Sequence, residues 1–156
     1  MLTAREFFDR VYKASEDKES CRNQLKMMES AALSLGGGGF ELRVRKSPNP
    51  NRQQDRSNAY MDRERALEAR MDEDDRIIGL GSIVIYGDDE RDGLDRAQSP
   101  KMADILWWRY LGGVTWTAVA SAVKLSVRPC QLLHNAALRW IDDTGFMADV
   151  IDGIDL

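Results

Sequence analysis

The first 35 residues contain neither Gly nor Pro, and apolar side chains recur there at alternating spacings of three and four. This spacing places the apolar residues on one stripe of an α-helix, as in a coiled-coil seam. Thr3, with Glu6 three positions later, matches a capping box at the start of a helix. We therefore expect one long helix from Thr3 to Leu35. Its stripe, broken only at a lysine, is Ala4, Phe7, Val11, Ala14, Lys18, Cys21, Leu25, Met28, Ala32 and Leu35.

A run of four glycines, Gly36 to Gly39, ends this helix because glycine readily adopts the left-handed backbone of a C-cap. A phosphate-binding loop is excluded, since no Gly-Lys-Ser/Thr follows and no strand precedes. The segment from Phe40 to Asn58 is polar and basic, and it contains Pro48 and Pro50. These features predict a flexible loop over residues 36–58.

A second long helix is predicted from Ala59 to Tyr86. Its apolar residues fall at near-heptad spacing, and two glycines, Gly79 and Gly81, weaken it locally. The stretch IVIY could instead be a short strand, but the sequence offers it no partner. The stripe of this helix includes Leu67, Met71, Ile78 and Ile85. Together the two long helices predict an antiparallel hairpin or a dimerisation surface, so a homodimer is one expected assembly.

Composition and charge narrow the class of protein. The chain has 43% hydrophobic residues and a formal net charge of −4. No apolar run approaches the length needed to cross a bilayer, and the N-terminus lacks a secretory pattern. We therefore expect a cytoplasmic protein without membrane contact. The two cysteines, Cys21 and Cys130, have no CxxC partner, which predicts two reduced thiols.

The distribution of charge favours a nucleic-acid partner despite the negative total. Between Lys101 and Ile141 the single acidic residue is Asp104. The basic residues in that segment are Lys101, Arg109, Lys124, Arg128 and Arg139. A locally basic surface is what contacts phosphates, so this region is the expected binding region.

The same region has the pattern of a helix-turn-helix. A compact helix, KMADILWWRYL, is stopped by Gly112-Gly113, and Thr115 caps a short helix from Trp116 to Val123. Lys124 and Leu125 form a turn, and Ser126 caps a last helix from Val127 to about Ile141. Two helices joined by so short a turn cross steeply and leave the second free to enter a major groove.

The outward face of the last helix carries the candidate DNA-reading residues. Their types are those that read base edges: Arg pairs with guanine, Gln and Asn pair with adenine, and Val contacts the thymine methyl. The base-reading candidates are Val127, Arg128, Gln131, His134 and Asn135. The candidates for phosphate contact are Arg109, Lys124 and Arg139, and Thr115 completes the predicted DNA-binding set.

Two further details are expected from the local sequence. Trp116 should be buried between the helices. Pro129 removes one amide from the first turn of the last helix, so the side chain of Ser126 should cap the amide of Arg128.

No enzymatic site is predicted. His134 is the sole histidine, and no second ligand or nucleophile lies at a motif spacing from it. The acidic connector from Gly87 to Pro100 does not match a calcium loop. We therefore expect a protein that is not an enzyme and that uses no cofactor or metal.

The stretch RYLGGVTWTAVASAVKLSVRPCQLLHNAALRWID resembles region 4 of bacterial sigma factors. It resembles more closely the sigma-region-4-like phage transcriptional regulators, the late-gene activators of the ArpU and RinA type. The resemblance covers about the last third of the chain. The residues that carry it are Arg109-Tyr110, Gly112 or Gly113, Thr115-Trp116, Val119-Ala120, Leu125-Ser126, Val127-Arg128, Leu133-His134 and Ala137-Leu138.

The resemblance implies a tetrahelical helix-turn-helix of phage or prophage origin, with RNA polymerase as a second partner. The sequence departs from the family pattern at three places. Lys124 stands where the family usually has Gly, Asn or Asp, so the resemblance implies a lysine in left-handed backbone, at a cost of about 1 kcal/mol. Thr117-Ala118 replaces a common acidic residue, and Pro129 occupies the third position of the last helix. The chain has no candidate for the sigma segment that melts the −10 element, so an activator or accessory factor is implied rather than a complete sigma factor.

The predicted fold is therefore all-α, with a helical hairpin over residues 1–98 and a sigma-region-4-like helix-turn-helix domain with an acidic tail over residues 99–156. The predicted function is sequence-specific binding of double-stranded DNA to regulate transcription. Two alternatives remain open. One is a small-terminase-like DNA-packaging adaptor, and the other is a protein that binds polymerase or sigma factor without reading bases.

Overall fold

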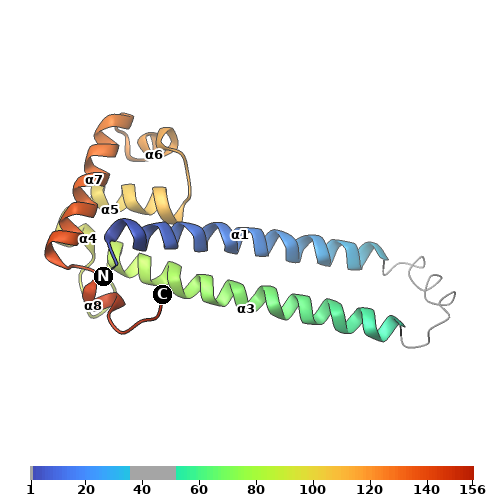
Figure 1. The fold of residues 1–156 in the computed structure, drawn as a ribbon. Helices are drawn as coiled ribbons and strands as arrows, with labels where there is room; N and C mark the ends of the chain where they lie inside the picture. The colour runs from blue at the N-terminus through green and yellow to red at the C-terminus, as the bar shows by residue number, and fades with distance from the viewer. Residues whose placement is uncertain (1, 36–51) are drawn as a thin grey trace. The chain divides into compact units, whose positions relative to one another are not determined.

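The computed structural model describes residues 2–35 and 52–156, and these residues confirm the all-α prediction (Figure 1). Within them, the sole β-type pairing is an isolated bridge between Gly87 and Asp92. The elements are α1 Ala4–Leu35, α3 Arg52–Tyr86, α4 Leu94–Ala97, α5 Pro100–Leu106, the π-helix η1 Trp107–Leu111, α6 Trp116–Val123, α7 Val127–Thr144 and α8 Ala148–Ile151.

The predicted loop over residues 36–58 is partly wrong. Residues 36–51, including the four glycines, lie outside the described residues. Residues 52–58, however, belong to α3, which begins at Arg52 rather than at Ala59. The physical reason is that RQQDRSN contains no Gly or Pro, and its Arg and Gln residues favour a helix. The stretch IVIY is also helical, so the strand alternative is wrong.

The start of α1 confirms the predicted capping box. The backbone N–H of Thr3 donates to Oε2 of Glu6 at 2.8 Å, and the backbone N–H of Glu6 donates to Oγ1 of Thr3 at 3.2 Å. These bonds to Thr3 hold the pKa of the Glu6 carboxyl below its ordinary value. Helix α1 therefore begins where the local sequence predicted.

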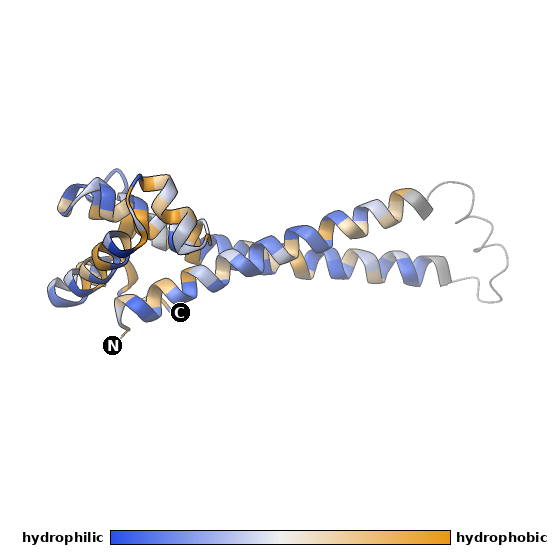
Figure 2. Ribbon diagram, turned by 90° about the horizontal axis from the view of Figure 1, so that it is seen from above, coloured by the Kyte–Doolittle hydropathy of each residue, from blue (hydrophilic) through white to orange (hydrophobic). Residues whose placement is uncertain are grey.

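The described chain divides into two compact units, Asp17–Glu73 and Met1–Glu16 with Asp74–Leu156. In the first, which we call the hairpin unit, cross-helix pairs show that α1 and α3 run antiparallel. Arg70 pairs with Asp17, and Nη2 of Arg63 donates to Oε1 of Gln24 at 2.8 Å. The described residues of this unit are mostly hydrophilic by the colouring of Figure 2. Its fully buried apolar residues include Cys21 and Leu67.

The second unit, which we call the head unit, holds the larger core. Side chains from the first turns of α1 and the last turns of α3 pack there with α4, α5, η1, α7 and Met147 before α8. Gly81 of α3 explains the close approach of the two long helices in this unit. A Cβ added at Gly81 would lie 2.9 Å from Cγ2 of Val11, too close for an unstrained contact. The glycine that weakens α3 locally therefore makes room for Val11.

A second cluster of buried side chains joins α5, α6 and α7. It contains Ile105, Val119, Ala120, Val123 and Cys130. Burial raises the pKa of the Cys130 thiol, and Cys21 and Cys130 form no disulfide with each other. No helix in the described ranges is both long enough and apolar enough to cross a membrane.

Candidate nucleic-acid interface

The boundaries of α6 and α7 agree with the predicted ones at Trp116, Val123 and Val127. Thr115 caps α6 as predicted, because its side chain accepts from the backbone N–H of Ala118 at 3.3 Å. Lys124 follows α6 in left-handed backbone with φ 59° and ψ 43°, also as predicted. At the same end, Nζ of Lys101 donates to the carbonyl of Val123 at 3.1 Å, so a lysine from α5 caps the C-terminus of α6.

The predicted side-chain cap at Ser126 is wrong. Ser126 does hold the N-cap position with extended backbone, but its hydroxyl makes no capping bond. The amide at the third helical position is a usual capping target, and there Pro129 has no N–H to offer. The carbonyl of Ser126 instead accepts from the backbone N–H of Cys130 at 3.4 Å, the first bond of the helix.

Most of the predicted base-reading residues do share an exposed face of α7. Arg128, Asn135 and Arg139 are exposed, and Val127 and Gln131 are half-buried. We call these residues, together with Leu132, the outer face of α7. Leu132 was missed by the sequence analysis although it is 55% exposed. The helical spacing of 128, 132, 135 and 139 was the signal that could have found it.

His134 is the clear error among the predicted site residues. It does not lie on the outer face, since it is only 4% exposed. The buried side chains of α7 fall at Cys130, His134, Ala137, Leu138 and Ile141, which is one helical stripe. The spacing of four from Cys130 already placed His134 on that stripe, but its polar chemistry led to the outward assignment.

The His134 ring is enclosed by aromatic groups and by hydrogen bonds. The Tyr110 hydroxyl oxygen lies 2.6 Å from Nε2, and Oδ1 of Asn135 lies 3.0 Å from Nδ1. The ring of Trp116 meets the histidine edge-to-face at a centroid distance of 4.9 Å, and the ring of Tyr110 stacks on it at 5.6 Å. Burial lowers the pKa of His134 and raises the pKa of Tyr110 to about 12.

Arg109 is used inside the protein rather than presented as a free cation. Its Nη1 donates to the carbonyl of Val114 at 3.0 Å, and its guanidinium carbon lies 4.8 Å from the centroid of the Trp116 ring. The guanidinium thus ties the loop after η1 to the start of α6. Trp116 is half-buried, so the prediction of a fully buried indole is correct only in part.

Arg5 of α1 lies beside this region and was not predicted. It lines a hollow of about 240 Å³ with Arg109 and His134, and a neighbouring hollow of about 390 Å³ with Asn135 and Arg139. The second hollow is also lined by Asp142 and Asp143, so its two cations face two carboxylates. Arg5 therefore borders the outer face without making that hollow strongly basic.

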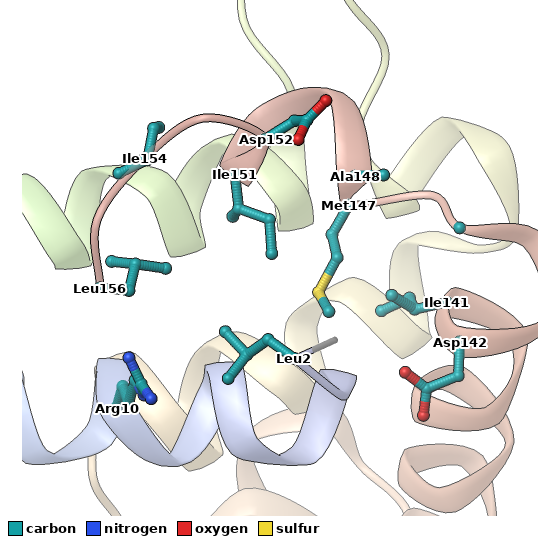
Figure 3. A pocket seen from close by; sticks show the side chains of 11 residues that line it. Leu2, Arg10, Ile141, Asp142, Met147, Ala148, Ile151, Asp152, Ile154 and Leu156 are labelled. Atoms are coloured by element: carbon teal, nitrogen blue, oxygen red, sulfur yellow. The ribbon is translucent and has the colours of Figure 1, made fainter.

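A separate apolar pocket of about 370 Å³ lies near the end of the chain. Its lining combines α1, α7, α8 and the residues that follow α8. Figure 3 shows Leu2, Met147 and Ile151 directed toward one another, with Arg10 and Asp142 among the polar side chains of the lining. Among the described residues, the lining is mostly apolar, and its charged side chains are Arg10, Asp142 and Asp152.

No protein-family model, no curated protein and no solved structure gives a significant match to this chain. The strongest chemical feature is the outer face of α7, where side chains able to form paired hydrogen bonds with base edges are exposed on one helix.

Proposed function

We propose that α6, the turn at Lys124 and Leu125, and α7 form a helix-turn-helix that binds double-stranded DNA, and that the protein regulates transcription. One observation carries the proposal. Along α7 the buried side chains form one stripe, and Arg128, Asn135 and Arg139 lie exposed away from it. A helix with this division can rest on the core and still insert its polar face into a major groove.

The roles within the proposed interface follow from position and chemistry. Arg128 lies in the first turn of α7, the end that enters the groove most deeply. Its guanidinium group can donate two hydrogen bonds to the O6 and N7 acceptors of guanine. Exposed Lys124 and Arg139 contact phosphates. Arg109 is removed from the phosphate-contacting set, because its guanidinium is bound to Val114 and Trp116.

The wider proposal has two further parts. Phage origin and RNA polymerase as a partner rest on the resemblance of the last third of the chain to sigma region 4. A homodimer through the hairpin unit is supported by large apolar side chains left on its surface, since Met27 and Leu33 are each 73% exposed. Sedimentation of the wild type and of Met27→Glu tests the dimer, because a monomer in both contradicts it.

The decisive experiment selects bound fragments from random DNA and then compares two classes of variant. Arg128→Ala should cost about 1–3 kcal/mol at the selected sequence and relax the preference at one base pair. Arg139→Ala and Lys124→Ala should weaken binding to selected and random duplexes alike. Each should also lower the salt dependence of binding by about one unit.

Comparing the two classes of variant distinguishes the reading of bases from a general electrostatic attraction to DNA. All three substitutions remove one positive charge, so a purely electrostatic surface would respond in the same way to each. If Arg128→Ala weakens selected and random duplexes equally, α7 does not read bases and a DNA-packaging adaptor is favoured. If the wild type does not bind duplex DNA even at low salt, a protein-binding role for the exposed Leu132 and its neighbours is favoured.

A further inference from the structure

The buried histidine links the interior of the head unit to the outer face of α7. Oδ1 of Asn135 can only accept a hydrogen bond, so Nδ1 of His134, 3.0 Å away, must carry the proton. In a neutral imidazole the other nitrogen, Nε2, is then an acceptor. The Tyr110 hydroxyl, 2.6 Å from Nε2, must therefore be the donor.

The three side chains form a series of two hydrogen bonds that run in one direction. Tyr110 donates to His134, and His134 donates to Asn135. Tyr110 is itself held in the core, with its ring 5.2 Å from that of Phe8, and the Trp116 ring closes against the histidine. This series of hydrogen bonds begins at the buried hydroxyl of Tyr110 in η1 and ends at the exposed amide of Asn135 in α7. His134 therefore connects a group in the core to a group on the surface.

We propose that Tyr110 and His134 are positioning residues that fix the orientation of the Asn135 amide for recognition of adenine. This inference rests on the proposed DNA-binding function. An asparagine amide reads adenine through one acceptor and one donor, and rotating it by half a turn exchanges the two. Because His134 donates to Oδ1, the exchanged orientation would place the Asn135 NH₂ group against an N–H donor, unless the imidazole proton moved to Nε2 and the Tyr110 hydroxyl became the acceptor.

The fixed orientation still leaves the amide able to read a base. A carbonyl oxygen has two lone pairs, so Oδ1 can accept from His134 and from the adenine amino group together. The NH₂ group of Asn135 can donate to the N7 atom of the same adenine. Asn135 would thus meet DNA with its amide already oriented, and less side-chain freedom is lost on binding.

The test uses the full chain and compares three variants by selection from random duplexes. Asn135→Ala identifies the base pair that the amide reads, where discrimination should fall by roughly 5- to 150-fold. Tyr110→Phe keeps the ring and its packing but removes the donor to His134. We expect it to lower discrimination at that same base pair, by a smaller factor than Asn135→Ala, and to leave the other positions unchanged.

Tyr12→Phe is the matched control. Tyr12 lines the same hollow as His134, but its hydroxyl donates to Glu16 at 2.7 Å, so the variant removes a hydroxyl without touching the chain of bonds. It should leave the selected sequence unchanged. Nitrogen NMR of His134 provides a second readout, because the wild type should show the Nδ1–H form and Tyr110→Phe should lose that preference.

The outcomes separate this inference from the proposed function. If the wild type selects no sequence, both fail. If the wild type is selective but Asn135→Ala changes no position, or Tyr110→Phe weakens every sequence equally, only the positioning role is overturned. A wild-type NMR spectrum of the Nε2–H form also overturns it, whatever the DNA data show.

Discussion

The backbone N–H of Ala4 donates a 2.7 Å hydrogen bond to Oδ1 of Asp142, across 138 residues of chain. The first amides of a helix have no partner within it, and a carboxylate at that end also interacts favourably with the helix dipole. The backbone amides of Thr3 and Glu6 are bonded to each other's side chains, whereas the acceptor for the amide of Ala4 is Asp142, which is distant in sequence. The first turn of α1 is thereby fixed to α7, which places Arg5 beside the outer face.

Removing this remote cap should destabilise the head unit. Asp142→Ala should lower the free energy of unfolding by about 0.5–2 kcal/mol, the range found for lost N-caps. Asp143→Ala is the matched control, since Asp143 is an exposed carboxylate in the next position. It should change stability by no more than about 0.5 kcal/mol. Urea unfolding of both variants provides the comparison, and equal losses would show that charge, not capping, is responsible.

Substitution by alanine at two glycines of α3 should change the stability of the protein in opposite directions. At Gly79 a Cβ would meet nothing within 4 Å, so Gly79→Ala should gain about 0.5–1 kcal/mol from helix propensity. At Gly81 the Cβ would meet Val11 at 2.9 Å, so strain should outweigh the propensity gain. Thermal unfolding should show a higher Tm for Gly79→Ala and a lower one for Gly81→Ala. A higher Tm for both variants would show that the Val11 side chain can move away from the added Cβ at little cost in stability.

Lys124 allows backbone strain to be separated from charge. Its φ of 59° is left-handed backbone, which costs a lysine on the order of 1 kcal/mol and costs glycine nothing. Lys124→Gly should therefore be more stable than Lys124→Ala by about 1 kcal/mol in denaturant unfolding. Both variants lose the same charge, so under the proposed function both should reduce the salt dependence of DNA binding equally. Equal stabilities would contradict the strain argument.

The buried histidine predicts a dependence of stability on pH. Burial lowers the folded-state pKa of His134, and a side-chain hydrogen bond to Asn135 opposes the shift. The charged groups that face the ring are Arg5, Asp9 and Arg109, with Tyr110 as the neighbouring titratable group. Below about pH 6.5 the unfolded chain binds a proton that the folded one does not. The contribution of the neutral His134 to stability is therefore complete above about pH 6.5 and is lost as the pH falls toward the folded-state pKa.

The measurement is the free energy of unfolding of wild type and His134→Gln at a series of pH values between about 5 and 8. The wild type should lose at most about 1.4 kcal/mol for each pH unit below 6.5 beyond what the variant loses. Because glutamine does not titrate, the difference between the curves isolates His134. Parallel curves would show that His134 binds its proton equally in the folded and unfolded states, which contradicts the lowered pKa.

Much of the local structure could be predicted from the sequence because it depends on neighbouring residues. The capping box of Thr3 and Glu6 closes within one turn, and Thr115 caps an amide three residues away. The exposure of Arg128 and Arg139 likewise follows from helical periodicity.

The errors at His134 and Arg109 depend on contacts that form only in the folded chain. Periodicity could place His134 on the buried stripe, but only Tyr110 and Trp116 could show how a polar ring is accommodated there. Arg109 was assigned to phosphates because its charge was visible and its acceptor on Val114 was not. A side chain's role depends on what surrounds it, and sequence spacing alone does not reveal that environment.

The sequence by itself thus determined most of the long helices, the caps at Thr3 and Thr115, and the periodicity that separates the two faces of α7. The tertiary structure decided which polar groups remain exposed. It fixed Ala4 to Asp142 and brought Val11 against Gly81. The physical reason is that helices form through bonds within a few residues, whereas burial and hydrogen bonding of side chains require surfaces from several helices to meet.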